Sequence, residues 1–160
     1  MRMIAEPQGI ASRRYSILRD GEPVSEISVP AFGPSTSAPI AGRMYRLRRA
    51  GLLRERFTLE VASRVAPVAR VTQSDPARRD YTVEVDARRL RLRAESPLRS
   101  GYLLLEGDRV VGALRPTGRL RRGIEADLPD ELPLEVGVFL VWVVLLLWRR
   151  SRVMRAGPSY

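Results

Sequence analysis

The chain has 160 residues, of which 44% are hydrophobic and 29% charged, values that are typical of a single folded domain and exclude an intrinsically disordered chain. Its net charge of +10 results from 28 arginines and 18 acidic residues. Cysteine and histidine are absent, which excludes disulfides, thiolate nucleophiles, imidazole bases and the zinc sites built from these ligands.

All the basic residues are arginines, and lysine and asparagine are both absent. This bias is typical of a GC-rich bacterial genome. A strongly positive chain favours anionic partners such as phospholipid headgroups or nucleic acid. The lack of cysteine fits a reducing compartment, and the first residues contain no apolar segment of the kind that directs export. We therefore expect a cytoplasmic protein, with peripheral membrane association as an option.

The first third of the chain predicts short strands separated by turns. We expect residues 1–12 to be an N-terminal extension that precedes the folded domain. Tyr15–Arg19 and Val24–Val29 then flank the turn signal Asp20–Pro23 and predict a hairpin. The stretch Phe32–Pro39, which is rich in Gly, Pro and Ser, predicts an irregular connection.

The next strands surround a turn at residues 50–51. Arg43–Arg48 predicts the strand before this turn. The segment 53–61 predicts the strand after it, with four apolar side chains on one face: Leu53, Phe57, Leu59 and Val61. Val65–Thr72 continues the meander, with Pro67 expected at an edge or a bulge.

Two further hairpins and one strand precede the C-terminal segment. Tyr81–Arg93 alternates apolar and polar residues around a turn near Asp86, and Gly101–Leu114 does so around a turn at Gly107–Asp108. Gly123–Leu128 adds a last short strand. The pattern as a whole predicts about nine to twelve strands.

The segment Val136–Trp148 is apolar on every side, so it must be surrounded by apolar matter. As a helix its thirteen residues span only about 20 Å, whereas a bilayer core needs roughly 30 Å. We therefore expect a helix over about 131–150 that is enclosed by the protein itself. A start signal at Asp130 precedes it, and a flexible basic tail, 151–160, follows.

The strands before the helix are the surface available to enclose it. We predict a mainly β fold: an antiparallel closed β-barrel of about 9–12 strands around a buried hydrophobic C-terminal α-helix. An eight-stranded barrel fills its interior with its own side chains, so a helix needs a larger one. Residues 13–150 are expected to form this single domain.

The strand Phe57–Val61, the hairpin Tyr81–Arg93 and the apolar helix Val136–Trp148 closed by arginines together resemble the tubby C-terminal-like superfamily, which includes phospholipid scramblases and LURP-one-related proteins. The resemblance covers nearly the whole chain and rests on strand spacing, not on a catalytic motif. It implies a closed barrel with the helix threaded through its centre, and functions that centre on membrane phosphoinositides or lipid movement. It transfers no ligand-binding residue.

Four arginines form the candidate binding site. A hairpin that turns at residues 50–51 would place on one outward face Arg46, Arg48, Arg54 and Arg56. Guanidinium groups hold phosphates through paired hydrogen bonds, so this face predicts an anion- or lipid-binding patch, with a merely solvated charged face as the alternative. A second group is expected to pair with Glu84 and Asp86 across its own hairpin: Arg88, Arg89, Arg91 and Arg93.

Nothing in the chain predicts an enzyme, a cofactor or a metal site, because the only bases are scattered carboxylates and no Gly-rich phosphate loop precedes a helix. We predict a non-enzymatic tubby- or scramblase-like barrel that binds anionic phospholipid at a membrane surface. One alternative is a tail-anchored membrane protein whose C-terminal helix inserts below a soluble β head. The other is a basic nucleic-acid-binding module, although no aromatic residues alternate with the arginines to stack on bases.

Overall fold

The computed structural model describes residues 1–9, 12–30, 33–51, 53–75, 77, 79–96, 99–117 and 123–155. These residues form twelve strands and one helix: β1 (Arg2–Pro7), β2 (Arg14–Arg19), β3 (Glu22–Ser28), β4 (Ser35–Ile40), β5 (Arg43–Ala50), β6 (Arg56–Val61), β7 (Ala69–Asp75), β8 (Asp80–Val85), β9 (Arg88–Ser96), β10 (Arg99–Glu106), β11 (Arg109–Thr117), β12 (Gly123–Asp127) and α1 (Leu134–Arg155). The strands pair antiparallel with their sequence neighbours, and the sheet closes into a barrel. The predicted fold class is confirmed.

Closure depends on β1, which pairs with β2 on one side and with β12 on the other. The expectation that residues 1–12 are an extension is therefore wrong for β1. This strand turns only Met3 and Ala5 into the core, and both are fully buried. Two inward side chains are too few to give a clear alternation, and pairing with β12 joins residues more than a hundred positions apart.

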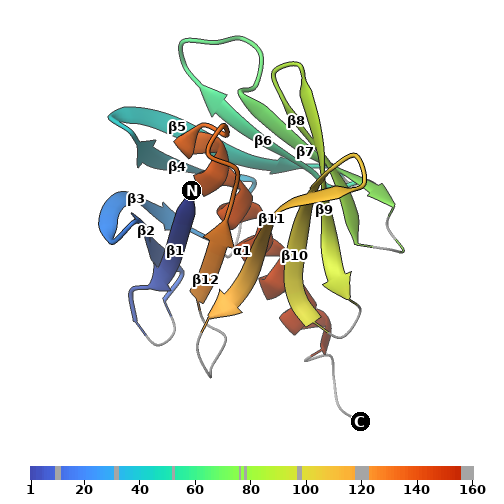
Figure 1. Cartoon of the computed structure of the whole chain (residues 1–160). Coiled ribbons are helices and arrows are strands. Elements are labelled where there is room, and N and C mark those ends of the chain that lie inside the picture. The colour runs from blue at the N-terminus through green and yellow to red at the C-terminus, as the bar shows by residue number, and fades with distance from the viewer. Residues whose placement is uncertain are drawn as a thin grey trace.

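The helix α1 runs through the ring of strands, as Figure 1 shows. Every residue from Val136 to Leu145 is buried, so each side of the helix faces the inner surface of the barrel. Trp142 packs edge-on against Phe57 of β6, with 6.2 Å between ring centroids. Both indole N–H groups donate to barrel carbonyls, Trp142 to Ser28 at 3.0 Å and Trp148 to Ser100 at 2.6 Å. Burial of these rings therefore leaves neither N–H unpaired.

In the described part of the chain, no helix combines the length and the apolar character needed to cross a membrane. The tail-anchor alternative would require α1 to leave the barrel that surrounds it.

Four local expectations are wrong. The stretch 35–40 is a strand, β4, although it contains Pro39, and residues 31 and 32 lie outside the described part. The strand expected from Val65 begins only at Ala69. Leu53, expected on the inner face, is exposed, and β6 begins at Arg56. The helix continues to Arg155 into the expected tail, of which residues 156–160 are not described.

The meander gives the barrel two ends of different construction. At one end lie the connections β2–β3, β4–β5, β6–β7, β8–β9 and β10–β11, together with residues 128–133, which lead from β12 into α1. At the other end lie the alternate connections β1–β2, β3–β4, β5–β6 and β7–β8, together with the last turns of α1. We call these the acidic end and the basic end, for the charges described next.

Candidate functional site

The charges of the two ends are opposite. The described connections of the acidic end carry five acidic residues and one arginine: Asp20, Asp86, Asp108, Asp130, Glu131 and Arg64. Those of the basic end carry three arginines and one acidic residue: Arg13, Arg54, Arg79 and Glu55. The helix adds Glu135 to the acidic end, and Arg149 and Arg150 to the basic end. Counted over these connections and the two ends of α1, the charges at the two ends of the barrel are therefore opposite, although at the acidic end the N-terminal amine of Met1 pairs with Asp130.

Turn chemistry explains the acidic end. Asp20 and Asp86 occupy hairpin turns with φ angles of 52° and 51°, a left-handed conformation that Asp tolerates better than most residues, and Asp108 follows Gly107 at φ 61°. Glu135 in the first helical turn complements the helix dipole. Arginine has no comparable preference for turns, so Arg13 and Arg54 have no local structural reason to lie at the basic end.

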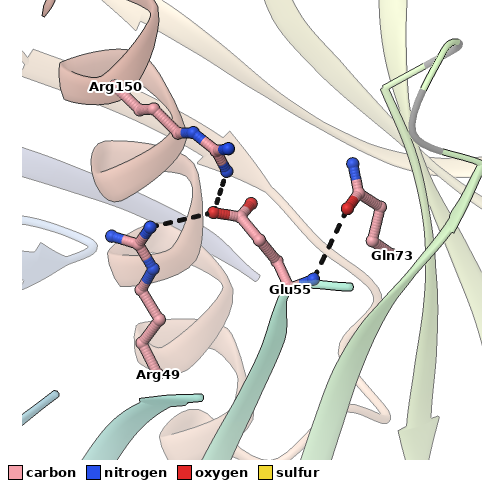
Figure 2. A network of polar contacts seen from close by, with 4 residues as sticks. All are labelled: Arg49, Glu55, Gln73 and Arg150. Carbon is pink, nitrogen blue, oxygen red and sulfur yellow. Dashed lines mark hydrogen bonds and ion pairs between the residues drawn. The ribbon is translucent and has the colours of Figure 1, made fainter. Parts of the chain in front are cut away.

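The basic end is organised around the buried carboxylate of Glu55 (Figure 2). One of its oxygens, Oε1, accepts from Arg49 Nη2 at 3.1 Å and pairs with Arg150 Nη1 of the helix. Gln73 of β7 completes the arrangement: its backbone N–H donates to the Glu55 carbonyl at 2.9 Å, and its side-chain oxygen accepts from the Glu55 N–H at 3.4 Å. The network joins β5, the β5–β6 connection and β7 to the C-terminal part of α1.

Exposure differs sharply within this network. The Glu55 side chain is only 8% exposed, whereas Arg49 is 45% and Arg150 48% exposed. The carboxylate is therefore enclosed while both guanidinium groups reach solvent. Two positive charges on one negative charge leave the network with a positive balance at the surface.

Two further arginines stack on buried tyrosines at this end. Arg79 lies 5.3 Å from the Tyr102 ring centroid and donates to its hydroxyl at 3.4 Å. Arg149 lies 6.0 Å from the Tyr15 ring and donates to its hydroxyl at 3.3 Å and to the Ser12 carbonyl at 3.0 Å. These contacts keep the guanidinium groups in place without neutralising them.

Tyr81 and Tyr102 line the inner side of the same end. Burial raises the pKa of both phenols, and the negative charge of Glu55 adds to the effect. The arginines nearby act in the opposite direction, but burial is the larger influence. Both hydroxyls therefore stay neutral at physiological pH and add no negative charge to the basic end.

The arginines predicted from sequence are brought together only in part. Arg46 and Arg48 of β5 and Arg56 of β6 lie at outward positions of one sheet face, since Leu47 and Phe57 next to them are buried. Arg54 is exposed but lies in the β5–β6 connection. Arg48 has an ion pair with Glu60 at 3.6 Å, and Arg46 donates to Ser35 Oγ at 3.4 Å.

Sequence reasoning missed Arg70, Arg49 and Glu55. Arg70 of β7 extends the predicted face, because it pairs in register with Thr58 of β6. Arg49 of β5 and Glu55, which directly precedes β6, occupy alternate positions that continue the inward-facing, apolar positions of the two strands. The sequence did contain a signal for this pair: a charged residue at an inward-facing position on each side of the same hairpin.

Of the pairs expected for the second arginine group, only one to Glu84 is present among the described residues, and Arg88 pairs outside its own hairpin. Arg89 pairs with Glu84 at 3.6 Å, and Arg88 and Arg91 pair with Glu106 and Asp80 at 2.6 and 3.0 Å. The expected contact to Asp86 is wrong, because that carboxylate lies 3.5 Å from Arg64 of the β6–β7 connection.

A shallow hollow of about 460 Å³ lies beside the acidic end, between β5 and the β6–β7 connection. Its lining includes Met44, Val61 and Val65, with Arg46 and Glu60 beside them. Met44 and Val65 are exposed apolar side chains. An exposed apolar patch thus exists near this end too, next to charges of both signs.

The architecture defines the class of protein: a closed twelve-stranded antiparallel barrel around a C-terminal helix, with a basic and an acidic end. No protein-family model matches the chain, and no curated protein or solved structure matches it either. The resemblance to the tubby-like superfamily therefore stays a prediction.

Proposed function

We propose that this protein is a non-enzymatic binding barrel of the tubby-like kind that docks on the surface of anionic phospholipid membranes with its basic end. The observation that carries the proposal is the charge separation between the two ends. Guanidinium groups bind phosphate oxygens in pairs, and each cationic side chain near an anionic bilayer contributes about 1 kcal/mol to binding.

Because the barrel is long compared with the distance over which charges are screened, each end interacts with a surface according to its own charge. A strand of six residues such as β6 spans roughly 20 Å, whereas charges are screened over about 10 Å at 0.1 M salt. A membrane that faces the basic end therefore interacts little with the aspartates of the other end. Orientation, and not net charge alone, decides the interaction.

A lipid surface fits the basic end better than a single-stranded nucleic acid does. Every aromatic side chain in the described part of the chain is buried, so no ring is presented for base stacking. The β5–β6 connection instead presents an exposed apolar residue, Leu53, next to Arg54. Apolar and cationic groups side by side are typical of surfaces that bind the membrane interface.

The test is co-sedimentation with vesicles of neutral phosphatidylcholine and with vesicles that contain 30% phosphatidylglycerol, at about 0.1 M salt. The basic-end variant carries Arg13→Gln, Arg54→Gln and Arg56→Gln, three exposed arginines without a carboxylate partner among the described residues. The control carries Arg19→Gln, Arg43→Gln and Arg109→Gln, equally exposed arginines at the acidic-end termini of β2, β5 and β11. Both variants lose the same net charge.

We expect anionic vesicles to bind the wild-type protein and neutral ones not to. The basic-end variant should bind about 100-fold more weakly, and the control should change by less than about threefold. Equal losses in both variants, or no preference for anionic vesicles, would contradict the proposal. Tighter binding of a duplex oligonucleotide than of vesicles at the same salt would replace it with the nucleic-acid alternative.

A further inference from the structure

We infer that Leu53 is the residue that enters the bilayer when the basic end docks, with the arginines around it on the lipid phosphates. The inference rests on the proposed function and adds to it the depth and orientation of binding. It follows from the way the β5–β6 connection is built.

The connection is a tight turn that holds Leu53 outward. Gly51 has a φ of +101°, and a Cβ placed there would lie 2.0 Å from the carbonyl oxygen of Arg54, so no other residue fits without moving the turn. The backbones of Gly51 and Arg54 thus approach each other closely. Leu53 lies within this turn and is 95% exposed.

Both sides of the turn are anchored. Arg49, before the turn, and Glu55, after it, pair with each other at 3.1 Å. Glu55 is also held by Arg150 of the helix and by the backbone and side chain of Gln73. Since the base of the turn is fixed before binding, little conformational freedom is lost when Leu53 enters the bilayer. These contacts therefore hold Leu53 in its exposed position before a membrane is bound.

The charges around Leu53 select the kind of surface. Arg54 is adjacent, and Arg49 and Arg150 at the base of the turn are about half exposed. An apolar side chain within a set of guanidinium groups complements an anionic bilayer, in which acyl chains lie below a layer of phosphates. The occupant we assign is the interface of an anionic phospholipid bilayer.

The opposite end supplies a matched comparison. Val65 is also fully exposed, in the β6–β7 connection beyond the other end of β6. Its neighbour Arg64 is already paired with Asp86 at 3.5 Å. The two apolar residues are alike in exposure, but only Leu53 lies where the described connections carry an excess of arginine.

The chain contains no cysteine, so single cysteines can be introduced and labelled cleanly. We would attach the environment-sensitive dye NBD to Leu53→Cys and, separately, to Val65→Cys in the full chain, and add vesicles with 30% phosphatidylglycerol. At position 53 we expect a blue shift, a several-fold rise in emission and quenching by lipids that carry a spin label near the headgroup. At position 65 the spectrum should stay that of a dye in water.

A second pair of variants measures affinity. Leu53→Ser should weaken binding to these vesicles about tenfold, while Val65→Ser should leave it unchanged. Vesicle binding with a water-like spectrum at position 53, or with the shift at position 65 instead, would overturn the inference and leave the proposed function standing. Absence of wild-type binding to anionic vesicles would overturn both.

Discussion

The two ends of the barrel are built from the same parts and carry opposite charges. Each has strand connections and one end of α1, and each has an exposed apolar residue nearby, Leu53 or Val65. At the acidic end, four of the five hairpin connections are two residues long, and aspartate suits such turns. At the basic end the connections β1–β2, β3–β4, β5–β6 and β7–β8 are four to six residues long, and the described residues of three of them include arginine. Exposed apolar surface alone does not distinguish the ends, whereas charge does.

The polar side chains of the two ends are also used differently. At the acidic end the ion pairs of the described connections are single contacts, Arg64 with Asp86 and the N-terminal amine of Met1 with Asp130. The basic end gathers Arg49 and Arg150 on a single carboxylate and stacks Arg79 on Tyr102. The short turns and exposed ion pairs of the acidic end are explained by folding alone. The excess of fixed arginines at the basic end is better explained by the binding of an anionic partner. This difference makes the basic end the candidate site.

The largest expected effect comes from breaking the element that connects both ends. Leu145→Arg places an unpaired charge in the centre of the barrel, where the native side chain is 2% exposed. We expect a loss of several kcal/mol in the free energy of unfolding, enough to prevent soluble expression. Leu53→Arg is the matched control at an exposed site, and it should change stability by less than about 0.5 kcal/mol in urea unfolding. Normal folding of Leu145→Arg would contradict the enclosed helix.

Next in size is the removal of the carboxylate that organises the basic end. Glu55→Gln leaves Arg49 and Arg150 without their shared counter-charge. We expect about 1 to 2 kcal/mol lower stability, less than for a fully buried pair because both arginines are half exposed. Glu60→Gln removes the carboxylate that pairs with Arg48 and that is more exposed than Glu55, so it should cost less than about 0.5 kcal/mol. Urea unfolding of both variants measures the difference, and equal costs would remove Glu55 from its central role.

Alkaline pH tests the environment of Tyr81 at the same end. Because burial raises its pKa in the folded state, the unfolded chain ionises first, near pH 10, and stability falls as the pH rises from there towards the folded-state pKa. Between pH 8 and pH 11, Tyr81→Phe should lose about 1.4 kcal/mol less than the wild type in urea unfolding. An identical loss in both proteins would show that Tyr81 is not shielded.

The smallest expected effect tests whether vesicle binding depends on the charge of the basic end or on the net charge of the protein. Asp86→Asn together with Asp108→Asn makes the protein more positive by two units at the acidic end only. Binding to anionic vesicles should tighten by less than about twofold, because this end lies roughly two screening lengths from the docked surface. A tenfold or greater increase in vesicle co-sedimentation would mean that overall charge, and not the basic end, governs binding.

The fold was predictable because its signals are local. Period-two alternation in Tyr81–Arg93 and Gly101–Leu114 corresponds to the hairpins β8–β9 and β10–β11, and the all-round apolar run Val136–Trp148 corresponds to the enclosed part of α1. The missed elements have weak or non-local signals. β1 has only two inward residues and is defined by its partners, and β4 contains a proline yet is held by pairing with β5 along its length.

The candidate site was predictable only in part for the same reason. Arg46, Arg48 and Arg56 could be placed on one outward face from parity alone, because parity is a property of the strand itself. The meeting of Arg49, Glu55 and Arg150 could not, since it joins a hairpin to a helix about ninety-five positions away. Nor does a single strand show which of its ends will lie beside the last turn of the helix.

The sequence by itself determined the alternation of strands, the apolar helix and the excess of arginine, since each depends on residues close together in the chain. It also led to the closed barrel, because a helix without a polar face has to be surrounded. Only the tertiary structure decided where the charges lie. In an antiparallel meander alternate connections lie at opposite ends, so charges evenly mixed along the chain become separated in space once the barrel closes.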